Sequence, residues 1–260
     1  MIKILRYSFY DLVRSKWSYI YLLFYLVLGF SLLFLNNNLS KAIITLMNII
    51  VVLTPMVGTL FGIMYCYSSR EFIELLLAQP IQRRSIFLGL YLGIASSLAL
   101  SMLLGLGIPF LAYGLLQTGE IGNFGYLLMA GTFLTFIFVA LAVNISLLHE
   151  NKIKGFGYAI LMWLFLAVIY DGLFLVLLVV MDAYPLDNFT LLAVIMNPID
   201  LSRIMVLLKL DISALLGYTG ALFQKFFGSG LGMLVALTTL VGWTIVPVWT
   251  MLKIARKKDF

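Results

Sequence analysis

The feature that most restricts how this chain can fold is a series of six long apolar stretches with almost no charged residues. A helix of about 20 apolar residues crosses the hydrocarbon core of a bilayer, and each stretch is long enough to do so. The chain is 63% hydrophobic and 11% charged, with a mean hydropathy of +1.10, whereas soluble domains carry about 25% charged residues. We therefore predict an all-α membrane protein, one transmembrane domain over residues 1–260. The six predicted spans are Trp17–Leu35, Ala42–Cys66, Ser85–Leu116, Gly125–Leu148, Phe156–Met181 and Leu231–Leu252.

Small residues and proline inside these stretches predict local features. Gly105, Gly107 and Pro109 lie within the overlong third stretch and predict a break or kink there. Gly58 and Gly62 in the second stretch have the Gly-x-x-x-Gly spacing that lets two helices approach closely. That contact would lie either within one chain or between two copies.

Residues 1–16 predict a helix that lies in the membrane interface. Apolar and basic residues separate onto different sides, and the basic side suits anionic headgroups. A simple anchoring tail is the alternative. Arg14 and Lys16 interrupt the apolar pattern, so this segment does not have the form of a secretory signal peptide. The apolar side holds Ile2, Leu5, Phe9, Leu12 and Val13, and the other side holds Lys3, Arg6, Tyr10 and Arg14.

The distribution of basic residues predicts the orientation of the chain. With six spans, both termini lie on one side, and 13 of the 17 Lys and Arg residues fall in the segments on that side. Basic residues concentrate on the cytoplasmic side of membrane proteins. We therefore expect a multi-pass protein of the bacterial inner membrane with both termini in the cytoplasm, together with the loop at residues 67–84.

The loop at residues 67–84 predicts a short amphipathic helix. Ser68 and Glu71 have the spacing of a capping box, which favours a helix start at Ser68. Pro80 favours its end after about three turns. Such a helix suits docking into a groove of a soluble partner. A positively charged loop resting on lipid headgroups, held by Arg83 and Arg84, is the alternative.

The segment at residues 182–230 is the only sizeable piece outside the predicted spans, and we expect it on the outer side. Asn197 and Pro198 predict a helix start, and Asp200 and Arg203 are spaced to pair along that helix. Asp211 predicts the cap of a second helix ending near Gly217. We expect short amphipathic helices on the outer leaflet, ready for an extracytoplasmic partner. The alternative is a lid that packs on the chain's own spans.

Asp171 is a carboxylate well inside the fifth span. A charge near the bilayer centre costs about 2.5–3.5 kcal/mol on insertion scales. Asp171 is therefore expected to be protonated, to pair with a group on another helix, or to face a polar cavity. Both a functional role and a structural hydrogen bond remain open.

The chain shows no sequence pattern for catalysis or metal binding. It has no Gly-x-x-x-x-Gly-Lys-Ser/Thr motif, so we expect ATP and Mg²⁺ to be bound by another subunit and no cofactor in this chain. The single histidine, His149, and the single cysteine, Cys66, do not make a metal cluster. No catalytic pair is visible, and nothing predicts nucleic-acid binding. These patterns favour a transporter subunit over an enzyme.

An acidic, leucine-rich helix followed by Leu77-x-x-Pro80-x-x-Arg83 resembles the loop after the second span of type-2 ABC transporter permeases. In that family this loop forms the coupling helix that docks on a separate ATPase, and the chain begins with an interfacial elbow helix. The resemblance implies that this role falls here to Ser68, Arg70, Glu71, Glu74, Pro80, Arg83 and Arg84.

Two further stretches resemble the NosY-type permeases of nitrous oxide reductase maturation: residues 163–178, which contain Asp171, and Met196–Arg203. The resemblance implies a homodimer that works with a NosF-like ATPase and an extracytoplasmic, β-helical NosD-like protein. That assembly serves the copper–sulfur site of the reductase by handling a sulfur species. The expected contacts with the outer partner are Asn197, Pro198, Asp200 and Arg203.

Two other functions remain open at this point. One is a type-2 ABC permease that exports a lipid, a polysaccharide or a drug. The other is a membrane assembly protein without a transport cycle.

Overall fold

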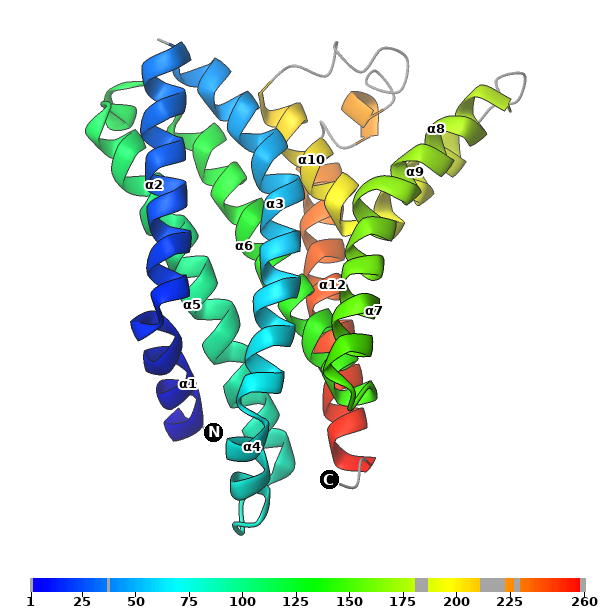
Figure 1. Ribbon diagram of the computed structural model, residues 1–260. Coiled ribbons are helices and arrows are strands. Elements are labelled where there is room, and N and C mark those ends of the chain that lie inside the picture. The colour runs from blue at the N-terminus through cyan, green and yellow to red at the C-terminus, as the bar shows by residue number, and fades with distance from the viewer. Residues whose placement is uncertain (1, 37, 181–186, 211–222, 227–229, 258–260) are drawn as a thin grey trace.

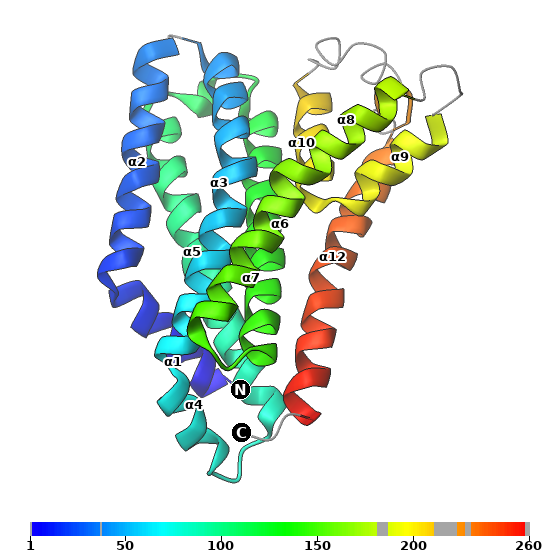
Figure 2. The ribbon, with the colours of Figure 1, turned by 45° about the vertical axis from the view of Figure 1, so that its right-hand side comes forward.

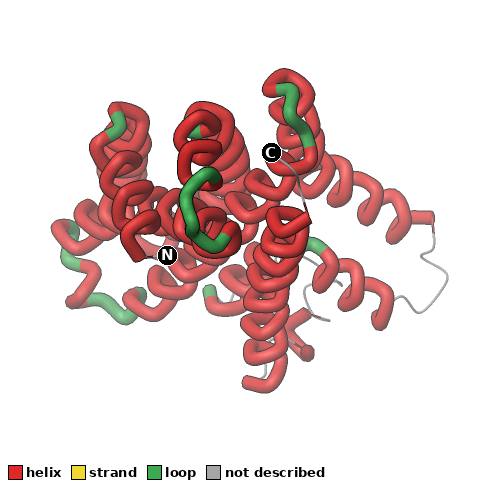
Figure 3. The backbone as a smooth tube through the Cα atoms, turned by 90° about the horizontal axis from the view of Figure 1, so that it is seen from below, coloured by secondary structure: helices red, strands yellow, loops and turns green. Residues whose placement is uncertain are grey.

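The computed structural model describes residues 2–36, 38–180, 187–210, 223–226 and 230–257. This part of the chain folds into helices joined by short loops (Figure 3). Six helical segments are long and apolar enough to cross a membrane, and they match the six predicted spans. They are α2 (Lys16–Asn36), α3 (Leu39–Ser68), α5 (Arg83–Ala112), α6 (Ile121–Leu148), the run of α7 (Lys152–Leu164), η2 (Phe165–Ile169) and α8 (Tyr170–Val180), and α12 (Gly230–Lys257).

Helices α3, α5 and α6 form the centre of the bundle (Figure 1), and their facing sides bury residues such as Ile50, Leu98 and Phe138. The α3–α6 contact is especially close, because a Cβ atom added at Gly62 would lie 2.9 Å from the Cβ of Ala142. The Gly58/Gly62 face is therefore used within one chain. Lipid tails are as apolar as the helix surfaces, so the hydrophobic effect does not drive helices together within a bilayer. Close packing is therefore a main source of attraction between α3 and α6.

The N-terminal helix α1 (Ile2–Arg14) packs beside α5 at the end of the molecule where both termini lie (Figure 1). Ile4 and Ser8 cover Gly89 and Gly93 of α5, which leave room for the α1 backbone. The hydroxyl of Tyr65 donates a hydrogen bond of 3.0 Å to Asp11, which ties α1 to α3. The α1 helix is thus fixed to the bundle by packing.

The structure corrects two sequence expectations about helix ends. The capping box at Ser68 is wrong: α3 continues through Ser68, Ser69 is the cap residue of α4 (Arg70–Leu77), and its side chain makes no capping hydrogen bond. Helix α4 is also shorter than three turns, with eight residues, although it ends before Pro80 as predicted. Extending α3 by further backbone hydrogen bonds has replaced the expected side-chain cap.

Of the break or kink predicted in the third span, the break is wrong, since α5 runs unbroken from Arg83 to Ala112. Gly105 serves instead as a contact point for α2, because a Cβ there would lie 2.7 Å from the Cβ of Tyr25. Pro109 lies in the last turn of α5, where few backbone hydrogen bonds remain to be lost. The short helix η1 (Leu115–Gln117) follows.

The segment before α12 folds back into the bundle. Helices α9 (Asp187–Met196) and α10 (Pro198–Lys209) meet at Asn197 with a bend of 111° and form a re-entrant hairpin or a broken span (Figure 2). The expectation of amphipathic helices on the outer leaflet is wrong for α10, because most of its side chains are buried. The second helix predicted from Asp211 to Gly217 lies outside the described residues.

We predict that Gly62→Ala lowers thermal stability, because the new methyl group would overlap the Cβ of Ala142. Overpacking of this kind costs about 1–3 kcal/mol. The measurement is the midpoint of thermal unfolding in detergent. Ala142→Gly in the same chain is expected to recover part of the loss. Gly107→Ala is the control, because an added Cβ there meets nothing within 4 Å. Equal midpoints for the Gly62 and Gly107 variants would contradict the close contact.

Candidate functional site

Helix α4 projects beyond the spans at the same end as both termini (Figure 1). The side chains that the sequence assigns to a coupling role are all exposed there, and Arg70 and Glu74 pair on the helix at 3.0 Å. Leu75 is 67% exposed at the same place, whereas Ile73 is buried against the bundle. The helix thus has one face anchored and one face free. The exposed set is Ser68, Arg70, Glu71, Glu74, Pro80, Arg83 and Arg84.

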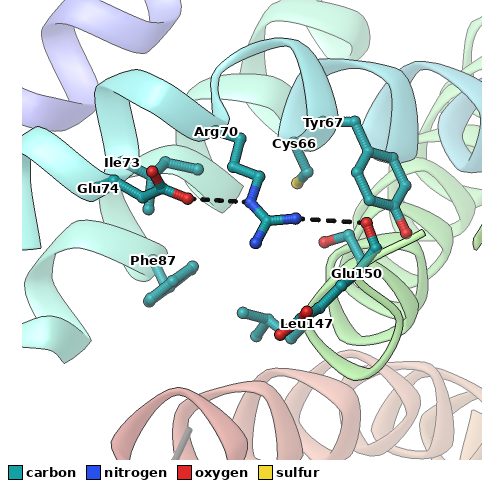
Figure 4. A pocket seen from close by; sticks show the side chains of 9 residues that line it. Cys66, Tyr67, Arg70, Ile73, Glu74, Phe87, Leu147 and Glu150 are labelled. Carbon is teal, nitrogen blue, oxygen red and sulfur yellow. Dashed lines mark hydrogen bonds and ion pairs between the residues drawn. The ribbon is translucent and has the colours of Figure 1, made fainter. Parts of the chain in front are cut away.

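The anchored face of α4 binds the loop between α6 and α7. Arg70 lies between the two, and its Nη1 donates a hydrogen bond of 3.3 Å to the carbonyl of Glu150 (Figure 4). At the end of α3, the hydroxyl of Tyr67 donates a 2.6 Å hydrogen bond to the carbonyl of His149. On the opposite side of α4, the ring of Phe72 stacks on Tyr7 of α1 at 4.7 Å. A displacement of α4 would therefore act directly on α1 and on the start of α7.

Sequence reasoning did not find these partners of α4. Tyr7, Tyr67 and His149 carry no motif, and their spacing in the chain gives no signal of contact. One local signal was available, because Gly155 places a residue without a side chain in the first turns of α7. A Cβ at Gly155 would overlap the Tyr67 hydroxyl, so glycine there is what allows Tyr67 to reach the loop.

The second candidate site is an ion-pair cluster between α8 and α10, here called the carboxylate–arginine cluster: Asp171, Asp200 and Arg203. Arg203 Nη1 donates a hydrogen bond of 2.8 Å to Asp171 Oδ2 and lies 3.5 Å from Asp200 Oδ1. Of the alternatives for Asp171, pairing across helices is therefore realised. The cluster holds two carboxylates against one guanidinium, a formal charge of −1.

Asn197 holds the apex of the α9–α10 hairpin. Its Oδ1 accepts a hydrogen bond of 3.1 Å from the Ile199 amide, which confirms the predicted helix cap with Pro198 behind it. Its Nδ2 donates to Asp200 Oδ2 at 2.7 Å and to the carbonyl of Leu166 at 2.9 Å. Leu166 belongs to the π-helical turn η2, and such turns often occur at functional sites.

Two further hydrogen bonds fix the hairpin to its neighbouring spans. The hydroxyl of Tyr170 donates to the carbonyl of Ala193 at 2.7 Å, and Trp243 Nε1 of α12 donates to the carbonyl of Ile195 at 3.1 Å. The last carbonyls of a helix lack partners within that helix. Side chains of α8 and α12 thus donate hydrogen bonds to the last carbonyls of α9.

The predicted contacts for an outer partner have mixed exposure. Asn197, Pro198 and Asp200 are buried, and only the side chain of Arg203 is partly exposed, at 28%. This burial favours the alternative of a segment that packs on the chain's own spans. Beside the cluster lies a cavity of about 170 Å³, with apolar walls that include Phe174, Val194 and Leu207.

The sequence analysis also missed a polar contact between α6 and α12. Asn144 Nδ2 donates to the carbonyl of Pro247 at 2.7 Å, and its Oδ1 accepts from the hydroxyl of Thr250 at 3.2 Å. Pro247 lies inside α12, and the buried amide of Asn144 gives the Pro247 carbonyl a hydrogen bond from a second helix. A polar residue inside the apolar fourth span was the available signal.

Comparisons with known proteins bear on what these sites do. No family model matches the chain. Among curated proteins, the chain is 25% identical over 210 residues to "Probable ABC transporter permease protein NosY" of Stutzerimonas stutzeri. The match covers 75% of this chain and 76% of that protein. The chain is therefore similar to an ABC transporter permease along most of its length. Six helical spans fit that similarity.

We predict that Asp171 and Arg203 are energetically coupled. In a double-mutant cycle of Asp171→Asn and Arg203→Gln, the coupling free energy is expected near 2 kcal/mol, because interactions within one ion-pair network lie at about 0.5–3 kcal/mol. The measurement is chemical or thermal unfolding in detergent. The Arg70–Glu74 pair is the matched control, with side chains 45% and 50% exposed and an expected coupling of about 0.3–0.5 kcal/mol. Equal coupling in both cycles would contradict a special role for the cluster.

Proposed function

We propose that this chain is the membrane-spanning permease subunit of an ABC transporter and that α4 is the helix on which a separate ATPase docks. The observation that carries the proposal is the similarity to a permease over three quarters of the chain. The exposed face of α4 at the end of a six-span bundle supports it. ATP and Mg²⁺ are bound by the ATPase, since this sequence has no P-loop motif.

The docking surface of α4 combines charge with an apolar contact. Glu71 lies on the free side, next to the exposed side chain of Leu75, and the exposed carboxylate of Glu74 is paired with Arg70. A short helix with this composition suits a groove on the ATPase that accepts the leucine side chain and has basic residues at its rim. Arg83 and Arg84, at the start of α5, would lie beside the docked ATPase.

The contacts behind α4 give a route for the force. ATP-driven closure of the ATPase subunits would move α4, and Arg70 and Tyr67 would carry the movement to the α6–α7 loop. Helix α7 leads through η2 to Asp171, which binds Arg203 of the hairpin. A two-state change along this route would link the ATPase end to the opposite side of the membrane.

We further propose that the ATPase end faces the cytoplasm of a bacterium and that the chain lies in the inner membrane. The described structure brings α1, α4, the α6–α7 loop and the end of α12 to one end (Figures 1 and 2). These segments, the last residues of the chain and the adjoining first turns of α2, α5 and α7 hold 13 of the 17 basic residues of the sequence. The positive-inside rule then supports both termini in the cytoplasm.

The chain functions in this proposal as a homodimer of the NosY type. The exposure of the fifth span supports contact with a second copy of the chain. Only 6% of its most apolar stretch is buried within one copy, the smallest share among the six spans. It also carries Asp171, whose side chain is 28% exposed beside Arg203. Lipid tails offer no hydrogen bonds to a charged pair at this depth, and a second copy would cover it.

The finer part of the proposal is a role in maturation of nitrous oxide reductase. The permease would work with a NosF-like ATPase and an extracytoplasmic NosD-like protein, and the complex would handle a sulfur species for the copper–sulfur site. It is supported by the similarity to NosY and by the cluster at the end of the force route. Since the hairpin apex is buried, the outer partner would bind the open ends of the hairpin, near Arg203 and Lys209.

We predict that Glu71→Lys and Arg83→Glu each weaken capture of the cognate ATPase by at least about tenfold, because a reversed charge at an interface costs several kcal/mol. The measurement is co-purification of the ATPase with the tagged permease. Lys41→Glu is the control, since it reverses an exposed charge at the opposite end of the molecule. Unchanged capture by both α4-end variants would refute this docking surface.

We predict that Asp171→Asn lowers the yield of the reductase copper–sulfur site by about fivefold. Coupling between two distant sites typically changes an equilibrium by about 5- to 150-fold, and the expected loss is the lower end of that range. The test uses the native host with this chain deleted and then restored as wild type or variant, and it measures copper content and the visible spectrum of the purified reductase. Glu120→Gln, which removes a carboxylate bound to Ser40 and Asn123 at the same end, is the control. A complete copper–sulfur site in cells without this chain would refute the maturation role and leave the ATPase proposal standing.

A further inference from the structure

A groove next to the first candidate site lies at the same end of the molecule, between the end of α6 and the last turns of α12. It has a volume of about 510 Å³ and an apolar floor made by Leu147, Leu148 and Ile254. Lys253 and Lys257 form its rim. In Figure 4, α12 is the red helix that passes below Leu147.

The two lysines are placed to act together on one anion. They are four residues apart in α12 and therefore lie on one side of the helix, and both are exposed. Neither forms an ion pair with any residue that the structure describes. Glu150 also lines the groove, so the formal charge of the lining residues is +1.

The neighbours of the groove indicate the depth at which it lies. The ammonium group of Lys253 is 5.1 Å from the ring centre of Trp249, which is 60% exposed. Tryptophan is enriched at the boundary between the hydrocarbon core and the headgroups. Leu148 is also 60% exposed, so the apolar floor opens toward the outside of the bundle at this boundary.

We infer that this groove binds one anionic phospholipid of the adjoining leaflet. An acyl chain lies on Leu147, Leu148 and Ile254, and the phosphate lies between Lys253 and Lys257. A basic pocket between membrane helices is a recurrent headgroup site, and here an apolar floor continues directly from it. Free phosphate would leave the floor uncovered, and a zwitterionic headgroup would oppose the net positive rim with its own cation.

The inference does not depend on the proposed transport function. The groove lies on the α12 side of the α6–α7 loop, whereas Arg70 and α4 contact that loop from the other side. The lipid would hold the end of α12 against α6 next to the loop that α4 contacts. If the ATPase is not captured, the lipid site is still supported by the lipid titration. If the lipid does not bind, the ATPase proposal still stands.

The test is native mass spectrometry of the full chain in mild detergent, titrated with phosphatidylglycerol. Each lysine near an anionic headgroup contributes about 1 kcal/mol, so Lys253→Gln or Lys257→Gln alone is expected to weaken binding about 5-fold and the double variant about 30-fold. Lys152→Gln with Lys154→Gln is the matched control, because it removes two exposed lysines beside the same loop, outside the groove. Thermal unfolding checks that all variants are folded.

Two further titrations separate the sources of the anion. Phosphatidylcholine and inorganic phosphate are expected to bind at least about 30-fold more weakly than phosphatidylglycerol. Leu148→Ser is expected to weaken the binding of phosphatidylglycerol but not that of inorganic phosphate, because it disrupts the apolar floor. Equal phosphatidylglycerol binding by the double variant and its control would overturn the site. So would a double variant that keeps lipid but loses ATPase capture, since the groove would then hold an acidic protein segment.

Discussion

The bilayer offers no hydrogen-bonding partner, and this constraint determines how the polar residues of the bundle are used. The π-helical turn η2 and the turn of α12 at Pro247 are irregular stretches of backbone, and each accepts a hydrogen bond from an asparagine side chain elsewhere in the fold. Asn197 reaches Leu166 in η2, and Asn144 reaches Pro247 in α12. The irregular backbone is therefore stabilised by long-range side-chain contacts.

The same constraint explains the carboxylate–arginine cluster. Asp171 alone on a poorly buried span would carry a charge into lipid, and Arg203 alone on the hairpin would do the same. Their 2.8 Å contact neutralises both and fixes α10 to α8. Asp200 is left with one oxygen, Oδ1, that is buried and makes no hydrogen bond in the described structure. The cluster is therefore held together by one arginine, and any change in its charge would bear on the whole hairpin.

Local patterns predicted much of the fold. Span number follows from run length and hydropathy, the end of α4 from Pro80, and the Asn197 cap from two adjacent residues, and each depends on physics within a few residues. The Ser68 capping box failed for a local reason, the extension of α3, whereas two other failures come from tertiary context. Gly105 was interpreted as a helix breaker but makes room for Tyr25, and α10 was placed on the surface because its partners on α3, α6 and α12 are distant in sequence. Asp171 could be recognised as needing a partner, whereas Arg203 could be identified as that partner only in three dimensions.

The uneven packing of the spans determines which part can move. Helix α7 packs on α3 at its inner half through Phe156 and Ala159, near Ile63 and Tyr67. Beyond that point α8 has no buried residue, and hydrogen bonds from Tyr170 to Ala193 and from Arg203 to Asp171 connect it to the hairpin. A shift of α8 would therefore meet little resistance from the α3–α6 core. The π-helical turn lies between α7 and α8 and is bound to Asn197 at Leu166, so a shift of α8 would reach the hairpin apex before it disturbed the buried centre.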